Sequence, residues 1–290
     1  MPLPPCKALV FDLDDTLVVE KASAAAALLT TAEMAARRYD LDPAALRDSV
    51  RETCRELWYH HCPARAYVVE IGISSWEALW SRFEGDNEHL ATLRAWAADY
   101  RRDAWHHALQ AHGVNDIDLA RELAEAFPTC RRKHHVVYDD VRPALERLQK
   151  TYRLALLTNG ASDLQREKIA GAGIGPYFEE ILVAGDIGVA KPHRRLFETM
   201  LARLDVAPAQ AVMLGDSQSK DIQGAQAVGM KAIWVNRDNA PRREGVTPDL
   251  EVTTLTTISK ETLAFPRGSP NPGAPGLRLP PSATEPLAPP

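Results

Sequence analysis

The sequence predicts an α/β protein with a doubly wound parallel sheet, into which an all-helical domain is inserted. In the second half of the chain, short apolar runs alternate with amphipathic segments of helix length, the pattern of parallel strands joined by crossover helices. Residues 18–138 break that rhythm, because they contain helical patterns and no convincing strand. The 290 residues, of which 45% are hydrophobic and 25% charged, are typical of a globular chain of roughly two domains.

Each predicted strand is a short apolar run bounded by turn or acidic residues. The first covers residues 7–11 and meets Asp12 at once, as a buried strand does when it opens onto a loop. The later strands are expected at residues 154–157, 181–184, 211–214, 232–235 and 250–254. The helices between them are expected at residues 141–150, 163–172, 194–204 and 219–228.

Residues 18–138, called the helical insert below, are expected to form helices at 23–38, 43–59, 75–83, 89–107 and 117–126. We therefore predict a core of residues 1–17 and 139–262, interrupted by an insert beside the carboxyl ends of the strands, where open sheets bind ligands. Nine of the 21 prolines fall between Pro266 and Pro290, so residues 263–290 are expected to be a disordered, Pro-rich tail.

Charge and composition exclude several classes of function. The formal net charge is -5 and the sequence pI is about 6.0, so the chain lacks the basic surface of a protein that tracks nucleic-acid backbones. We find no apolar stretch long enough to cross a membrane, and no signal-peptide pattern. Four cysteines without close metal-ligand spacing are expected to be reduced thiols in the cytoplasm. Any phosphate must therefore be held by local groups.

Asp12 and Asp14 follow the first predicted strand, and the period of two along an extended chain places both carboxyl groups on one side. Two carboxylates this close repel each other, so such a pair tends to bind a cation or to share a proton. Phosphoryl transfer to a carboxylate nucleophile can use both outcomes. The alternative is an ordinary acidic turn at a strand end, which this spacing alone does not exclude.

Polar groups suited to a phosphate follow the later strands. Thr158, Asn159 and Gly160 supply a hydroxyl, an amide and a flexible backbone that can cradle phosphate oxygens. Lys191 supplies an ammonium group shortly before the helix expected from residue 194. Taken singly, the first group is a commonplace turn and the lysine a solvated loop residue.

A second pair of acids, Asp216 and Asp221, follows the strand expected at residues 211–214. Taken alone, Asp216 or Ser217 would simply cap the next helix. However, an acid pair, a hydroxyl turn, a lysine and a second acid pair occur in succession, each at a predicted strand end or helix start. Because a parallel sheet brings such ends together, the set favours a phosphate site over a series of coincidences.

These ordered motifs resemble those of the haloacid dehalogenase superfamily of phosphohydrolases. The four motifs of that family are matched over residues 7–240 by Asp12-x-Asp14-x-Thr16, by Thr158-Asn159-Gly160, by Lys191-Pro192, and by Gly215-Asp216-Ser217 with Asp221. The helical insert is similar to the helical C1-type cap of the family. The residues after the second and fourth motifs are most similar to the N-acylneuraminate-9-phosphatase and pyrimidine 5'-nucleotidase branch.

The resemblance implies a role for each matching residue. Asp12 would be the nucleophile that accepts the phosphoryl group as an aspartyl phosphate. Asp14 would protonate the leaving oxygen and later activate water. Thr158, Asn159 and Lys191 would bind the transferring phosphate, Asn159 chiefly through its backbone.

The resemblance also implies Mg²⁺ as the cofactor. Asp12, the backbone carbonyl of Asp14, and Asp216 would ligate the ion, while Asp221 would act through water or from outside the ligand shell. Mg²⁺ takes oxygen ligands, so these carboxylates suit it better than the scattered histidines and cysteines do. The expected function is Mg²⁺-dependent hydrolysis of a small phosphomonoester, such as a nucleoside monophosphate, a sugar or sialic acid phosphate, or phosphoglycolate.

Three other functions remain open at this stage. A 2-haloacid dehalogenase also uses an aspartate nucleophile, although the family's dehalogenases lack the second acid, here Asp14. A sugar-phosphate mutase, of the phosphoglucomutase type, shares nearly the whole site. A regulatory or binding module on the same fold normally requires a damaged site, and every motif position here is intact.

Three smaller features complete the sequence interpretation. Residues 58–65 form an aromatic and basic cluster that could recognise the substrate, with ordinary packing as the more common explanation. The adjacent histidine pairs are expected to be non-catalytic, because neighbouring residues of a helix point in different directions; they are His60-His61, His106-His107 and His134-His135. His193 and Arg194 follow the third motif where this branch usually has an Asp-Pro, so helix entry and local charge are expected to differ.

Overall fold

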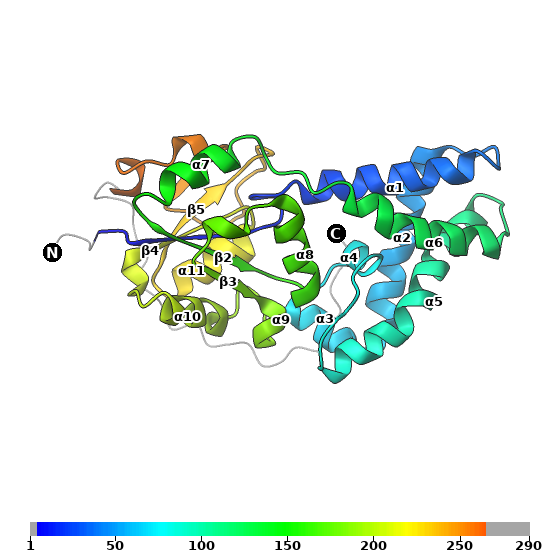
Figure 1. The fold of residues 1–290 in the computed structure, drawn as a ribbon, viewed down its shortest axis with the longest axis horizontal. Coiled ribbons are helices and arrows are strands. Elements are labelled where there is room, and N and C mark those ends of the chain that lie inside the picture. Colours follow the sequence, from blue (N-terminus) through cyan, green and yellow to red (C-terminus); the bar gives the residue numbers. More distant parts are fainter. Residues whose placement is uncertain (1–4, 265–290) are drawn as a thin grey trace.

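Six parallel strands form the sheet of the computed structural model, which describes residues 5–264 (Figure 1). They are β1 (Ala8–Phe11), β2 (Arg153–Thr158), β3 (Glu180–Val183), β4 (Ala211–Gly215), β5 (Lys231–Val235) and β6 (Leu250–Val252). Their order is β3-β2-β1-β4-β5-β6, so β1 lies between β2 and β4. The predicted doubly wound α/β fold is confirmed.

Helices cover the sheet because its strands are apolar on both faces. The helices of this part of the chain are α7 (Val141–Leu148), α8 (Ser162–Ala172), α9 (Ala184–Ile187), α10 (Arg194–Arg203) and α11 (Gln223–Ala227). Leu9 and Phe11 of β1 pack in one buried cluster with α7, whereas Ala8 and Val10 pack in another with α10. Alternate residues of one strand therefore contribute to two cores, as expected of a buried parallel strand.

Between β1 and β2 the chain forms the helices of the insert, which lie together beside the sheet in Figure 1. They are α1 (Glu20–Ala36), α2 (Pro43–Glu56), α3 (Arg65–Ile71), α4 (Ser75–Ala78), α5 (Glu88–Ala111) and α6 (Ile117–Arg132). Helix α2 begins as the sequence predicts, because Pro43 stands at its first turn and the Asp42 side chain accepts the Ala44 N–H at 2.9 Å. The division into a core and an inserted domain stays a prediction.

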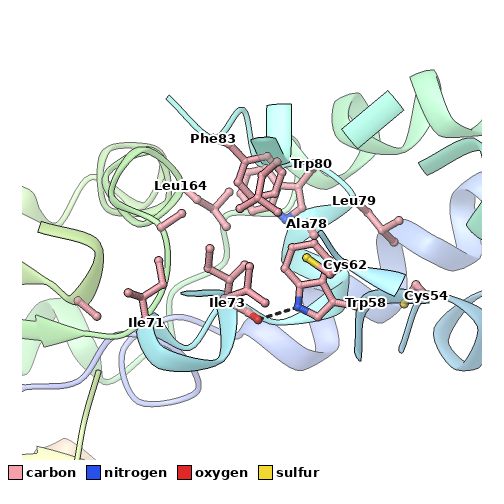
Figure 2. Close-up of a cluster of buried hydrophobic side chains, with 14 of the residues drawn as sticks. Cys54, Trp58, Cys62, Ile71, Ile73, Ala78, Leu79, Trp80, Phe83 and Leu164 are labelled. Atoms are coloured by element: carbon pink, nitrogen blue, oxygen red, sulfur yellow. Dashed lines mark hydrogen bonds between the residues drawn. The ribbon is translucent and has the colours of Figure 1, made fainter. Parts of the chain in front are cut away.

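Aromatic packing fixes the centre of the insert. Trp58 is fully buried, stacks on Phe83 and Trp96, and donates its indole N–H to the Ile73 carbonyl at 3.0 Å, as Figure 2 shows for the bond to Ile73. Trp58 therefore acts in packing, and it holds in place the backbone of the segment that joins α3 to α4.

Several predicted element boundaries were wrong. The helix expected at 75–83 ends at Ala78, because Arg101 of α5 binds the Ala78 carbonyl at 3.2 Å and Phe83 adopts a left-handed backbone with φ of 53°. The helix expected at 117–126 continues through Pro128 to Arg132. Helix α3 was not expected, and the helix expected at 219–228 is a π-helical turn (Gln218–Ile222) followed by α11.

Three expectations from the sequence concern membrane-spanning segments, the cysteines and the Pro-rich tail. Among residues 5–264, no helix combines the length and apolar character that crossing a bilayer requires. Cys6, Cys54, Cys62 and Cys130 are all free thiols. The predicted disordered tail falls almost entirely on residues 265–290, which lie outside the described part of the chain.

Candidate active site

A pocket of about 460 Å³ lies at the carboxyl ends of β1, β2 and β4. Asp12 directly follows β1, Thr158 ends β2, and Asp216 directly follows β4. Because β1 lies between β2 and β4, residues more than 200 positions apart in the sequence converge there. The pocket is also lined by residues of the insert, among them Val68 and Trp76.

Lys191 is the cation at the centre of the site. Its Nζ lies 2.5 Å from Asp12 Oδ1 and 2.7 Å from Asp221 Oδ1, and donates to the Leu157 carbonyl at 2.9 Å. The residue is 4% exposed. Burial alone would lower the pKa of this amine, but Asp12 and Asp221 raise it, so Lys191 stays charged. Lys191 thus lies between Asp12 of the first motif and Asp221 of the fourth, and its expected contact with phosphate stays a prediction.

Thr16 connects the loops that follow β1 and β4. Its hydroxyl donates to Asp12 Oδ2 at 3.1 Å and accepts the backbone N–H of Asp216 at 3.0 Å. The threonine is fully buried. It therefore orients the Asp12 carboxylate and fixes the backbone that carries Asp216.

Three carboxylates converge on one point. Asp12, Asp216 and Asp221 each offer an oxygen, and these atoms lie within 4.8 Å of one another. Burial, with repulsion from Asp221 and Asp14, raises the pKa of Asp12 to about 7, although Lys191 opposes the shift. Burial and the charges of Asp12 and Asp221 raise the pKa of Asp216 to about 8. Negative charge in excess of what Lys191 neutralises, offered by oxygen ligands, fits a hard divalent cation.

Asp221 is fixed in the site by its surroundings, although it does not directly follow β4. It is 1% exposed, and its Oδ2 accepts the Ser217 N–H at 2.9 Å. A Cβ atom built on Gly215 would lie 2.6 Å from the Cβ of Asp221 and closer still to its carboxyl group. The glycine at the end of β4 therefore leaves the room that Asp221 occupies.

Asp14 lies in the same pocket, but its side chain is outside the cluster of three carboxylates. Lys168 Nζ lies 3.0 and 3.1 Å from its two oxygens, and Gln165 donates to Oδ2 at 2.9 Å. The two motif-one acids thus have different partners, since Asp12 faces Lys191 and Asp14 faces α8. A metal contact of Asp14 through its backbone carbonyl stays a prediction.

Thr158 and Asn159 of the second motif both make side-chain hydrogen bonds within the site. Thr158 is buried, and its hydroxyl accepts the amide N–H of Gln165 at 2.6 Å. Asn159 was expected to act chiefly through its backbone. That expectation stays a prediction, and the Asn159 side chain pairs with the backbone of Lys191, accepting the N–H at 2.8 Å and donating to the carbonyl at 3.2 Å. Asn159 therefore positions the lysine.

Four further residues of the site were not predicted from the sequence: Gln165, Lys168, Glu77 and Glu20. The first two stand three residues apart on α8, so they share one face of that helix directly after the second motif. That spacing was a readable signal. Their partners were not, because Asp14 is 154 positions from Lys168 and Glu77 is 91 positions away.

The insert rests on the motif loops through its backbone. The Gly160 N–H donates to the Ile71 carbonyl at 2.8 Å, and the Ala190 N–H donates to the Glu70 carbonyl at 2.9 Å. Gly72, with φ of 76°, turns the chain next to Asn159. These contacts come from residues 70–72, which directly precede Ile73, whose carbonyl Trp58 binds (Figure 2).

Of the aromatic and basic cluster at residues 58–65, Tyr59 lines the pocket, whereas Trp58 is in the core of the insert. The remaining members of that cluster are not among the residues that line the pocket in the described part of the chain, and neither are the three histidine pairs. His193 caps α10, accepting the Arg195 N–H through Nδ1 at 3.2 Å. His193, which stands where this branch usually has an Asp-Pro, therefore provides the N-terminal cap of α10.

Comparison with known proteins agrees with this geometry. Residues 6–229 match the family model described as "haloacid dehalogenase-like hydrolase". The phosphoserine phosphatase of Thermus thermophilus is 36% identical over 87% of this chain and 97% of its own. The N-acylneuraminate-9-phosphatase of Mus musculus is 29% identical over 80% of this chain and 83% of its own.

Among solved structures, the 2-haloacid dehalogenase of Pseudomonas syringae pv. Tomato is 31% identical, with a TM-score of 0.51, over 89% of this chain and 98% of its own. The motifs at the strand ends, the convergent acids around one lysine and the family match over most of the chain lead to one assignment. The chain belongs to the haloacid dehalogenase-like hydrolases.

Proposed function

We propose that this protein is an Mg²⁺-dependent phosphomonoesterase that works through an aspartyl phosphate on Asp12. The observation that carries the proposal is the division of the motif-one acids: the Asp12 carboxylate faces Lys191 at 2.5 Å, whereas the Asp14 carboxylate faces Lys168 of α8 at 3.0 Å. A nucleophile and a separate proton carrier are what two-step phosphoryl transfer needs.

In the first step, an Asp12 oxygen attacks phosphorus while the bond to the ester oxygen breaks, and Asp14 gives the leaving oxygen a proton. In the second step, water attacks phosphorus, the bond to Asp12 breaks, and Asp14 takes a proton from the water. Lys191, with the Thr158 hydroxyl, holds the charged oxygens of the phosphoryl group. Phosphoryl transfer depends mostly on such positioning and charge neutralisation.

Asp12, Asp216 and Asp221 are the side chains that would hold Mg²⁺, with the Asp14 backbone carbonyl as the further predicted ligand. Bound there, the ion neutralises negative charge on the phosphate and the carboxylates. Two observations support Mg²⁺ binding by these residues. The three carboxylates each offer an oxygen to one point, and burial with mutual repulsion raises the pKa values of Asp12 and Asp216, so a bound cation would favour their ionised forms.

Small phosphorylated metabolites are the proposed substrates. Two relatives that cover most of this chain are named for phosphoserine and for N-acylneuraminate 9-phosphate, and a pocket of about 460 Å³ accommodates molecules of this size. We place the enzyme in the cytoplasm on the basis of its free thiols, four of which occur in the chain.

A substrate panel tests the proposal directly. Phosphoserine, N-acylneuraminate 9-phosphate, nucleoside monophosphates, sugar phosphates and phosphoglycolate are each incubated with the enzyme and Mg²⁺, and released phosphate is measured. We expect hydrolysis of at least one of them, loss of that activity in excess chelator, and recovery when Mg²⁺ is restored. Undiminished activity in excess chelator would remove the metal from the mechanism, and failure of every phosphomonoester would overturn the proposed function.

Dehalogenation is the second candidate, because one solved relative is a 2-haloacid dehalogenase. The presence of Asp14 favours phosphate ester hydrolysis, because the dehalogenases of this family lack the second motif-one acid. Halide release from 2-haloacids, measured beside the phosphate assay, separates the two activities. A mutase would instead convert a hexose 1-phosphate into an isomer without accumulating inorganic phosphate.

The stabilisation that Mg²⁺ gives should increase with pH. The pKa values of Asp12 and Asp216 are raised to about 7 and about 8 in the metal-free protein, above the unfolded value of 3.8. Their contribution to stability is therefore present at pH 4 and is lost as pH rises to 8. Because Mg²⁺ binds the ionised carboxylates, it competes with protons more strongly at pH 6 than at pH 8.

We therefore expect the Mg²⁺-induced increase in Tm to be larger at pH 8 than at pH 6. Thermal unfolding with and without Mg²⁺ at both values measures it, with NaCl of equal ionic strength as the control. Equal increases at the two pH values would show that these carboxyl groups do not bind the ion.

A further inference from the structure

Lys168 is a buried cation that the proposed mechanism leaves unexplained. Its side chain is 1% exposed, and its Nζ contacts both oxygens of Asp14, at 3.0 and 3.1 Å. The same ammonium group lies 2.6 Å from Glu77 Oε1 and 3.3 Å from Glu20 Oε2. Lys168 belongs to α8 of the sheet region, whereas both glutamates belong to helices of the insert. One ammonium group thus joins a residue of the reaction to the insert.

Helix α8 holds the Asp14 carboxylate from two positions. Gln165, one turn before Lys168, is fully buried and donates one amide nitrogen to Asp14 Oδ2 at 2.9 Å and to Thr158 Oγ1 at 2.6 Å. Lys168 contacts the remaining oxygen as well as the shared one. Both oxygens of Asp14 therefore have a donor on the same face of one helix.

Hydrogen bonds with Ser74 fix the side chain of Glu77. Its Oε2 accepts the backbone N–H of Ser74 at 2.9 Å, and its own backbone N–H donates to the Ser74 hydroxyl at 3.4 Å, which together form the capping box of α4. The same Oε2 also accepts the Ser74 hydroxyl at 2.7 Å. This leaves Oε1 for Lys168. Helix α4 follows residues 70–72, which rest on the loops at Gly160 and Ala190. The place of Glu77, and hence its bond to Lys168, depends on how the insert sits on those loops.

Glu20 completes the network at the point where the chain enters the insert. It is the first residue of α1, and it pairs with Arg131, which is 2% exposed and lies near the end of α6. Two cations, Lys168 and Arg131, thus meet the three carboxylates of Asp14, Glu20 and Glu77. Buried charges remain in such an arrangement when each has partners.

We propose that Lys168 is a positioning residue: it holds the Asp14 carboxylate in the orientation that hydrolysis of the aspartyl phosphate requires, and Glu77 ties that orientation to the seated insert. The proposal rests on the proposed phosphatase function. In this step a water oxygen bonds to phosphorus, the bond from phosphorus to Asp12 breaks with its electron pair returning to the carboxylate, and Asp14 receives the proton of the water.

The two half-reactions depend on Lys168 to different extents when the leaving group is a weak base. With p-nitrophenyl phosphate, the nitrophenolate departs without a proton, so formation of the aspartyl phosphate does not need a well-placed Asp14. Hydrolysis of the intermediate still does. The ratio kcat/KM reports the steps through nitrophenolate release, whereas kcat also includes the hydrolysis.

For Lys168→Met we expect kcat for p-nitrophenyl phosphate to fall about tenfold or more, because a displaced base slows the second step. We expect kcat/KM to stay within about twofold of the wild-type value, which means that KM falls together with kcat. Acid-quenched mass spectrometry should show the phosphorylated enzyme accumulating in the variant. Lys168→Arg, which keeps the charge and so retains the fold if the methionine variant does not, should show a smaller fall of the same kind.

Glu77→Gln keeps the cap of α4 and removes one charge from Lys168, so it should give the same pattern at smaller amplitude. The matched control is Lys150→Met, which removes a lysine from an exposed position outside the pocket and should change neither constant.

A purely structural role would lower kcat and kcat/KM together in folded Lys168 variants, and that result, or an unchanged kcat, would overturn the proposal. A wild-type enzyme that, with Mg²⁺, releases neither nitrophenolate nor phosphate from any phosphomonoester of the panel would instead refute the phosphatase function, whatever the variants do.

Discussion

Asp12→Asn should reduce turnover by about 10⁴-fold or more while the protein stays folded. The Asp12 carboxylate is the nucleophile of the proposed reaction, and an amide is neither an anion nor an equivalent metal ligand. The fold should survive because Lys191 keeps Asp221 at 2.7 Å and the Leu157 carbonyl at 2.9 Å. Phosphate release from the best substrate of the panel measures the loss.

Stability gives this prediction a second readout. The pKa of Asp12 is raised to about 7, so its ionisation costs the metal-free protein stability at pH 8. A neutral asparagine removes that cost, and we expect the Tm at pH 8 in chelator to be no lower than that of the wild type. Asp118→Asn, at an exposed position on α6, is the matched control for activity. Normal hydrolysis by Asp12→Asn would disprove the aspartyl-phosphate mechanism.

Gly215→Ala should reduce kcat/KM by about 10²-fold and weaken Mg²⁺ binding by about ten- to a hundredfold. The added Cβ would lie 2.6 Å from the Cβ of Asp221 and closer to its carboxyl group, so Asp221 has to move. That movement removes one carboxylate from the cluster and one partner from Lys191. Because the site is tightly packed, we also expect the variant to lose about 1–3 kcal/mol of unfolding free energy.

Gly175→Ala is the control for that substitution. A Cβ atom there meets Ile169 Cγ2 at 3.4 Å, which is ordinary van der Waals contact, and Gly175 does not line the pocket. Its activity and Mg²⁺ affinity should match those of the wild type. Equal Mg²⁺ affinities for Gly215→Ala and Gly175→Ala, measured by titration calorimetry, would show that Asp221 takes no part in binding the ion.

The sequence contains enough information to predict the sheet and much of the site. Buried parallel strands are apolar on both faces, so their runs stand out from amphipathic helices. Most motif residues lie at the end of one of these runs, whereas Lys191 lies shortly before a helix. Once the strands are known to be parallel, their carboxyl ends must meet. The convergence of Asp12, Thr158 and Asp216 is therefore a consequence of topology.

The parts that sequence reasoning missed depend on contacts between distant segments. The end of α4 is set by Arg101 of α5 taking the Ala78 carbonyl, and no local pattern encodes that. Helix α6 passes through Pro128 because Phe127 and Arg131 are buried on either side of it and hold the chain in place. The role of Asn159 toward the Lys191 backbone likewise appears only when the two loops are side by side.

The contacts between residues 70–72 and the motif loops use main-chain atoms on both sides: the carbonyls of Glu70 and Ile71 accept the N–H groups of Ala190 and Gly160. Such bonds are indifferent to the identity of the side chains. In the proposed enzyme, mutations at neighbouring pocket positions such as Val69 are therefore expected to alter which metabolite is accepted without removing these main-chain bonds. This separation would let gene duplicates diverge in substrate preference by single substitutions, with the chemistry retained throughout.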